Sequence, residues 1–78
     1  MNLARRAGEV GGTLPAVLNA ANEIAVDAFV NRKINFPQIT ETVQRTMDKH
    51  KPVAHATLEQ ILEADSWARK EAGSLSKL

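Results

Sequence analysis

Apolar residues recur at spacings of three and four along most of this chain, which is the period of an amphipathic helix. The clearest stripe consists of Leu14, Val17, Leu18, Ala21, Ile24, Ala25, Ala28 and Phe29. It predicts a helix over about 14–31 with this stripe as its core face. A shorter stripe precedes it and consists of Leu3, Ala7 and Val10. It predicts a short helix that ends at Gly11 and Gly12, which act as a C-terminal cap.

Two further helices are predicted downstream. In the third, Pro37 is the expected first-turn residue, the helix ends before Pro52, and the stripe is Phe36, Ile39, Val43 and Met47. In the fourth, Thr57 and Gln60 have the spacing of a capping box. The apolar stripe of the fourth helix is Leu58, Ile61, Leu62, Ala68 and Ala72. Gly73 and the Ser/Lys tail after it are expected to fray.

The fold class predicted is all-α, because no segment alternates with the two-residue period of a strand. The connections have ordinary length, which favours a small antiparallel helical bundle of three to four helices. With 78 residues the chain forms at most one domain, and such a domain buries only about 60% of the surface that its unfolded chain exposes. We therefore expect marginal stability.

The amino-acid composition excludes several classes of binding partner. Ten basic and nine acidic residues give a net charge of +1, so there is no electrostatic reason to expect nucleic acid or an anionic membrane. The apolar runs are too short for a transmembrane span, and the N-terminus lacks the apolar core of a signal peptide. The absence of cysteine permits a reducing compartment. The expected localisation is cytoplasmic.

The segment Gly11, Gly12 and Thr13 has two interpretations. A phosphate could bind the free N–H groups at the start of a helix. However, the segment lacks the lysine and the glycine spacing of a P-loop, and no strand precedes it. A helix stop followed by a cap is favoured, with the Thr13 side chain capping the second helix and Pro15 in its first turn.

The chain offers no convincing catalytic or metal-binding set. His50 and His55 lie five apart with Pro52 between them, so one helix cannot present both to a metal, and they are expected to be surface residues. Glu23 and Asp27 are a carboxylate pair typical of a solvated helix face. No catalytic, cofactor-binding or metal-binding residue is assigned to this chain.

Asp65 projects into the middle of the predicted stripe of the fourth helix. A carboxylate there needs partners, because burying an unpaired charge costs several kcal/mol. The candidates are Arg69, one turn further on, and free N–H groups at the start of another helix. The second is favoured, so Asp65 is predicted to be a structural tie between helices, with simple partial exposure as the alternative.

Four residues predict a contact surface for another domain. Trp67 projects away from the stripe of the fourth helix, and Asn19, Asn22 and Val26 lie on the polar side of the second. Such a mixture of apolar and amide side chains is typical of interfaces between domains. The alternative is an ordinary surface.

Nearly the whole chain resembles the C-terminal helical domain of the 1-deoxy-D-xylulose 5-phosphate reductoisomerase family. The resemblance rests on residues 11–17, 18–26, 34–39 and 63–69. Two of these segments are specific: Leu-Asn-Ala-Ala-Asn-Glu-Ile-Ala-Val at 18–26 and Glu-Ala-Asp-Ser-Trp-Ala-Arg at 63–69.

The resemblance implies that residues 1–78 are the C-terminal α-helical domain of an NADPH-dependent enzyme of non-mevalonate isoprenoid biosynthesis. It implies an N-terminal dinucleotide-binding domain and a central catalytic domain that are absent from this chain, with Met1 standing where the upstream polypeptide would join. NADPH and a divalent cation (Mg or Mn) belong to those domains, and none of their binding motifs occurs here. The implied partner of this chain is the catalytic domain of the same enzyme, which is expected to be a homodimer.

Two alternatives come from other classes. One is a stand-alone helical protein-interaction module without enzymatic activity. The other is a small helix-turn-helix protein that binds DNA, which the near-neutral charge and the lack of a strongly basic helix disfavour.

Overall fold

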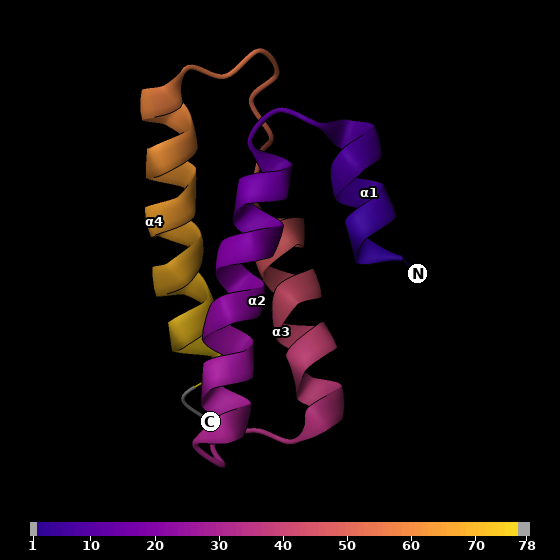
Figure 1. The fold of residues 1–78 in the computed structure, drawn as a ribbon, viewed down its shortest axis with the longest axis vertical. Helices are drawn as coiled ribbons and strands as arrows, with labels where there is room; N and C mark the ends of the chain where they lie inside the picture. Colours follow the sequence, from indigo (N-terminus) through magenta and orange to yellow (C-terminus); the bar gives the residue numbers. More distant parts are fainter. Residues whose placement is uncertain (1, 77–78) are drawn as a thin grey trace.

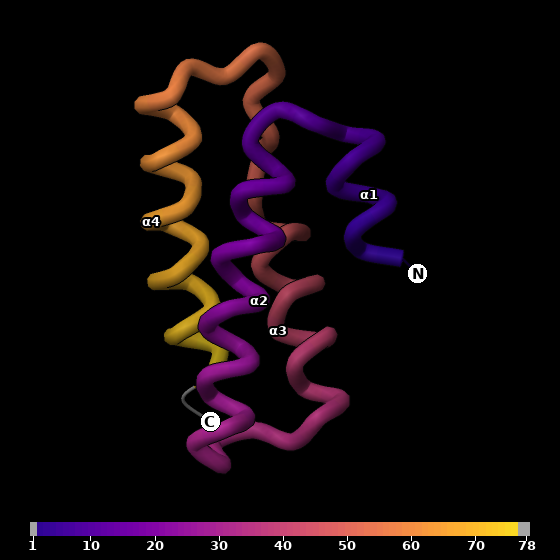
Figure 2. The backbone as a smooth tube through the Cα atoms, in the orientation of Figure 1, coloured from indigo at the N-terminus to yellow at the C-terminus, as the bar shows by residue number. Residues whose placement is uncertain are grey.

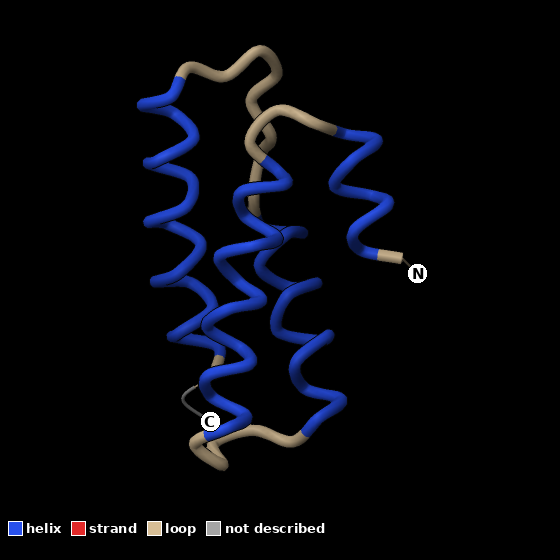
Figure 3. The backbone as a smooth tube through the Cα atoms, in the orientation of Figure 1, coloured by secondary structure: helices blue, strands red, loops and turns tan. Residues whose placement is uncertain are grey.

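The computed structural model describes residues 2–76, so Met1, Lys77 and Leu78 lie outside the described part of the chain. Within it the chain forms four helices and no strand (Figures 1 and 3): α1 (Leu3–Val10), α2 (Leu14–Val30), α3 (Phe36–Lys49) and α4 (Leu58–Leu75). The all-α prediction is confirmed, and each predicted helix is present.

Consecutive helices run in opposite directions, as the tube in Figure 2 shows, so α2 and α4 run in the same direction. Helix α2 packs against each of the other three, and its contacts with α3 and α4 are the most extensive. The bundle is therefore organised around α2, whose buried face is shared between its neighbours.

Small side chains dominate the buried interior. Helix α4 buries only Ala64, Ala68 and Ala72. Helix α2 buries Leu14, Val17, Ala20, Ala21, Ala25 and Ala28. Since alanine ends at Cβ, helices that meet through alanines can approach closely, and Val43, Met47 and Ile34 complete the core beside them.

The predicted stripe of α4 is wrong at its two leucines. Leu58 is 72% exposed and Leu62 is 60% exposed, whereas Ala64, which was not in the stripe, is buried. At about 100° per residue, Leu62 lies about 120° around the helix from Ala68. The side of α4 that faces the bundle is set by its close contact with α2, which accepts alanines and excludes the larger leucines.

The two phenylalanines also depart from the prediction. Phe29 is 39% exposed and Phe36 is 71% exposed, so neither belongs to the core. Their rings lie edge to face with centroids 5.8 Å apart, in an arrangement that aromatic pairs prefer. They contact each other across the α2–α3 turn because the alanine-rich interior leaves no space for rings.

The helix ends follow local chemistry. The capping box of α4 is confirmed: Thr57 N–H donates to Gln60 Oε1 at 2.9 Å, and Gln60 N–H donates to Thr57 Oγ1 at 3.2 Å. A second capping box, formed by Asn35 and Gln38, starts α3 and was not predicted. Helix α4 continues through Gly73 to Leu75, so the expected fraying there is wrong. The expectation for Lys77 falls outside the described residues.

Candidate interdomain surface

One face of α2 is left uncovered by the bundle. Asn19, Asn22, Val26 and Val30 follow one another at spacings of three and four and are all exposed. Val26 is 39% exposed and Val30 is 69% exposed. The residues on the opposite side of α2 are its alanine-rich core, so the two faces of this helix differ sharply in environment.

Two shallow hollows lie along this face. One is lined by Asn22, Glu23, Val26, Asp27 and Val30. The other is lined by Ala4, Leu18, Asn19 and Asn22. Asn22 lines both hollows, so they adjoin each other along α2. Together they include Asn19, Asn22 and Val26, which are three of the four residues predicted to contact another domain.

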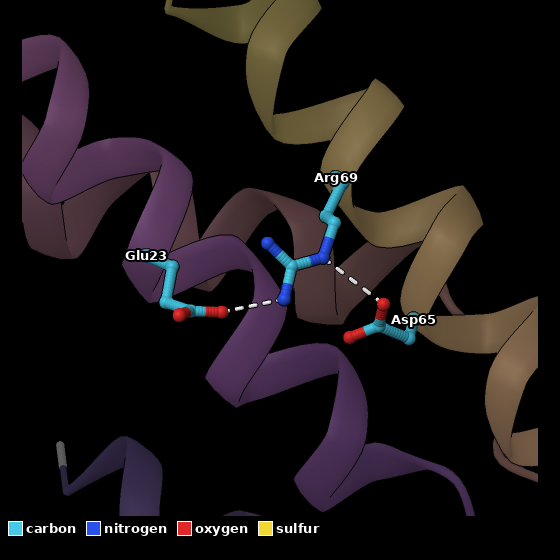
Figure 4. Close-up of polar contacts among 3 residues, drawn as sticks. All are labelled: Glu23, Asp65 and Arg69. Atoms are coloured by element: carbon cyan, nitrogen blue, oxygen red, sulfur yellow. Dashed lines mark hydrogen bonds and ion pairs between the residues drawn. The ribbon is translucent and has the colours of Figure 1, made fainter.

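Asp65 makes a different contact from the one predicted. Its Oδ2 accepts a hydrogen bond from Arg69 Nε at 3.0 Å, one turn along α4, and not from the start of another helix. Arg69 also reaches across to α2, where its guanidinium donates to Glu23 Oε2 (Figure 4). The hydrogen bond to Asp65, followed in strength of effect by the one to Glu23, raises the pKa of Arg69 above its usual value.

The tie between helices therefore exists, but Arg69 makes it. The side chains of Asp65 and Arg69 remain one-third or more exposed, so Asp65 is not the buried carboxylate that the helical projection indicated. The projection placed Asp65 at the centre of a stripe whose leucines are exposed, which moves Asp65 to the edge of the buried side. Glu23, expected to be merely solvated, is the partner on α2.

Thr13 stands at the N-cap of α2, but its side chain does not cap that helix. The Oγ1 atom of Thr13 lies 2.7 Å from Nε2 of His50 and accepts a hydrogen bond from the Val53 N–H at 3.0 Å. Burial lowers the pKa of His50, which favours a neutral imidazole. A neutral ring with its proton on Nδ1 can accept the Thr13 hydroxyl proton at Nε2.

Trp67 belongs to the same contact and not to the α2 face. Its ring lies 5.3 Å from the ring of His50, centroid to centroid, and it is a half-buried side chain packed against the core. Trp67 lies away from the predicted leucine stripe as expected, but that side of α4 packs against the core, so Trp67 is not an outward-facing residue. His50, predicted to be a surface residue, is half-buried. Only His55 is exposed, as predicted for both histidines. The sequence separation of 17 between His50 and Trp67 gave no signal of this contact.

Leu58 and Leu62 were missed as surface residues, although both carry a usable signal. They were assigned to the core because they are large and apolar, yet they share a stripe with the charged residues Asp65 and Arg69.

No group of three or more His, Cys, Asp or Glu side chains is placed to hold a metal ion within residues 2–76. In the same range no helix is long and apolar enough to cross a bilayer.

The described residues thus form an all-helical unit with an uncovered face of mixed apolar and amide side chains on α2. Comparison with known proteins makes the assignment specific. The family model described as DXP reductoisomerase C-terminal domain matches residues 1–71. This chain belongs to that family.

Individual relatives agree with the family match. The 1-deoxy-D-xylulose 5-phosphate reductoisomerase of Desulforamulus reducens is 52% identical over 75 residues, which are 96% of this chain and 19% of the relative. The reductoisomerase of Halothermothrix orenii is 50% identical over 72 residues, or 92% of this chain and 19% of the relative. The chain thus spans about a fifth of the length of the curated relatives that it matches.

A solved structure has the same fold. The 1-deoxy-D-xylulose 5-phosphate reductoisomerase from Zymomonas mobilis, determined in complex with NADPH, superposes with a TM-score of 0.87 at 43% sequence identity. The match covers 96% of this chain and 20% of that chain. The four-helix arrangement is therefore that of a domain within a much longer polypeptide in this relative.

Proposed function

We propose that this chain is the C-terminal structural domain of an NADPH-dependent reductoisomerase that converts 1-deoxy-D-xylulose 5-phosphate to 2-C-methyl-D-erythritol 4-phosphate in non-mevalonate isoprenoid biosynthesis. The observation that carries the proposal is the match of 96% of this chain to only 19% of a reductoisomerase. A segment with that relation to its relatives supplies one part of an enzyme and not the reaction centre by itself.

The division of labour follows from the side chains of this domain. The described residues group no three metal-ligating side chains, and the polar network that crosses from α4 to α2 is the ion pair of Arg69 with Glu23, beside the pair of Arg69 with Asp65 within α4. From the family relation we assign NADPH, which the Zymomonas mobilis relative binds, and a divalent cation (Mg or Mn) to other domains of the same enzyme. We expect the fragment alone to be inactive.

The role proposed for this domain is to pack against the catalytic domain and hold its arrangement. Asn19, Asn22 and Val26 form the contact surface on α2, and their exposure in the bundle supports this role. Trp67 is proposed as a contact at the edge of α4 through the part of its ring that the core leaves uncovered. The whole enzyme is proposed to be a cytoplasmic homodimer.

The native protein tests the proposal directly. An antibody raised against this chain captures its target from source cells, and the mass and peptide sequences of the captured band are determined. We expect a band several-fold larger than 8.5 kDa, with peptides from a dinucleotide-binding region.

A band near 8.5 kDa without such peptides would contradict the proposal. The chain would then be the stand-alone helical interaction module, and its relation to reductoisomerases would be one of ancestry. Reductoisomerase activity in the captured larger protein, with NADPH as the reductant, would complete the assignment.

A further inference from the structure

Helix α4 carries a second exposed stripe that the proposed contact surface does not include. Leu58, Leu62, Asp65 and Arg69 succeed one another at spacings of four, three and four, so they share one side of the helix. The first two are largely exposed leucines, and the last two form the ion pair of α4. Two exposed leucines one turn apart are an apolar ridge with no partner inside the bundle.

The ion pair between Arg69 and Glu23 places this ridge beside the uncovered face of α2. The two helices run in the same direction (Figures 1 and 2), and Arg69 lies next to Glu23 (Figure 4). One turn back along both helices, Asp65 stands at the level of Asn19, and one further turn back Leu62 stands at the level of the first turn of α2, which contains Pro15. The leucine ridge and the α2 face are thus neighbours on one side of the molecule.

We infer that α2 and α4 together form a single docking face for the part of the reductoisomerase polypeptide that lies outside this sequence. The face consists of Asn19, Asn22, Val26 and Val30 on α2 and Leu58 and Leu62 on α4. We call it the two-helix face. The inference rests on the proposed function and extends it, because it adds a second helix and an apolar ridge to the contact.

The occupant follows from length and charge. This domain is about a fifth of its relatives, so a reductoisomerase supplies about four times its length in other domains that must contact it somewhere. The bundle leaves two valines and two leucines exposed on one side, which fits a permanent contact better than free solvent. Glu23, Asp27 and Asp65 lie on or beside this face, and Arg69 pairs with Glu23 and Asp65. This excess of carboxylates fits a partner surface that supplies hydrogen-bond donors, and it opposes an anionic lipid surface.

The ion pairs of Arg69 have a role in this arrangement. The pair with Glu23 joins α4 to α2, and the pair with Asp65 lies within α4 beside it. The link to Glu23 therefore brings the leucine side of α4 next to the valine side of α2. Such an interface needs both ridges in place at once, since complementarity is a property of the whole surface.

Cysteine labelling in the full-length reductoisomerase tests the inference. This chain contains no cysteine, so single sites can be introduced once the cysteines elsewhere in the polypeptide are replaced. The test sites are Leu62→Cys and Val26→Cys, and the control is Glu63→Cys, which is the exposed neighbour of Leu62 on the same helix. The reaction rate of each thiol with a maleimide is compared in the folded protein and in urea.

We expect Leu62→Cys and Val26→Cys to react at least about tenfold more slowly in the folded protein than in urea, because an interface core excludes solvent. The control at Glu63 should show much less protection. Protection of Val26→Cys without protection of Leu62→Cys would overturn the two-helix face and leave the α2 contact and the proposed function intact. If all three thiols reacted as fast in the folded protein as in urea, both the α2 contact and the α4 contact would be overturned.

A concentration series identifies the occupant. Protection that is unchanged on dilution supports a contact within one polypeptide. Protection of Leu62→Cys that disappears on dilution would overturn the inference, because the occupant would then be a second copy of the protein.

Discussion

At the scale of single residues, one hydroxyl group joins three segments of the chain. Thr13 Oγ1, at the start of α2, contacts His50 at the end of α3 and the Val53 N–H in the following loop. Trp67 covers the His50 ring from α4. The long α3–α4 connection is thereby held against the beginning of α2, and the fold depends on small groups at this position.

Gly12 makes that contact possible, and we predict that Gly12→Ala destabilises the bundle. Gly12 has φ of +58°, and a Cβ atom there would lie 2.2 Å from the Val53 carbonyl oxygen. Either the loop shifts away from Thr13 or the backbone is strained, so we expect a loss of about 2 kcal/mol or more in chemical denaturation. Gly8→Ala is the control: nothing lies within 4 Å of its Cβ position, and we expect a gain of about 0.5–1 kcal/mol from helix propensity. Equal effects of the two substitutions would contradict this account.

His50 makes stability depend on pH. Burial lowers the pKa of folded His50 below its ordinary value of 6.5, so the unfolded chain binds the proton first. Stability is therefore complete above pH 6.5 and falls as the pH drops from 6.5 toward the folded pKa. We predict that His50→Gln flattens the pH dependence of the unfolding free energy below pH 6.5, and His55→Gln, at an exposed site, is the control. An identical slope in both variants would place the effect elsewhere.

At the scale of helices, the contact between α2 and α4 is set by alanine. Ala64, Ala68 and Ala72 are the only residues that α4 buries completely enough to count as core, and they meet a helix that is itself rich in buried alanine. Because alanines occupy this contact, the leucines of α4 lie at the surface. Close approach of two helices excludes large side chains at the contact, and these side chains then become available to other domains.

We predict that enlarging one of these alanines destabilises the bundle. Ala68 has no exposed surface, so Ala68→Leu forces α2 and α4 apart and should lower the unfolding free energy by about 1–3 kcal/mol. Lys70→Leu, on the exposed side of the same helix, should change it by less than about 0.5 kcal/mol. Denaturant titration of both variants provides the measurement. Tolerance of leucine at position 68 would mean that the interior is loosely packed.

At the scale of the whole molecule, the bundle leaves large apolar side chains uncovered on both α2 and α4. The exposed valines of α2 and leucines of α4 lie on helices whose opposite sides are already buried. This distribution suits a domain that is completed by contact with a larger protein. It also agrees with the small share of the relatives' length that this chain represents.

We predict that Val26→Lys weakens the docking of this domain without unfolding it. Val26 is 39% exposed, so the isolated bundle should remain folded, with a change within about 0.5 kcal/mol. In the full-length protein the lysine enters the proposed interface, and we expect weaker docking, seen as a separate unfolding transition of this domain at lower temperature. Thr40→Lys, which adds the same charge to the exposed side of α3, is the control. Unfolding of the isolated bundle by Val26→Lys would instead assign Val26 to the core.

The sequence determined what depends on neighbouring residues. Helical periodicity gave the four helices, Gly11 and Gly12 gave a helix end, and Thr57 with Gln60 gave a capping box, because each of these depends on atoms a few residues apart. The family was also readable, since residues 18–26 and 63–69 carry specific runs of side chains. Asn19, Asn22 and Val26 were placed on an exposed side correctly, and their contact with another domain stays a prediction.

Which apolar residues lie inside depends on how the helices pack against one another. The apolar pattern predicts that Leu62 and Phe29 are buried, but the close spacing between the packed helices buries the smaller Ala64 and Ala20 instead. The partners of Thr13, His50 and Trp67 were likewise out of reach, because these contacts join residues separated by 17 to 40 positions. Local pattern fixes the direction in which a side chain points on its helix. The packing of the helices against one another decides what lies in that direction.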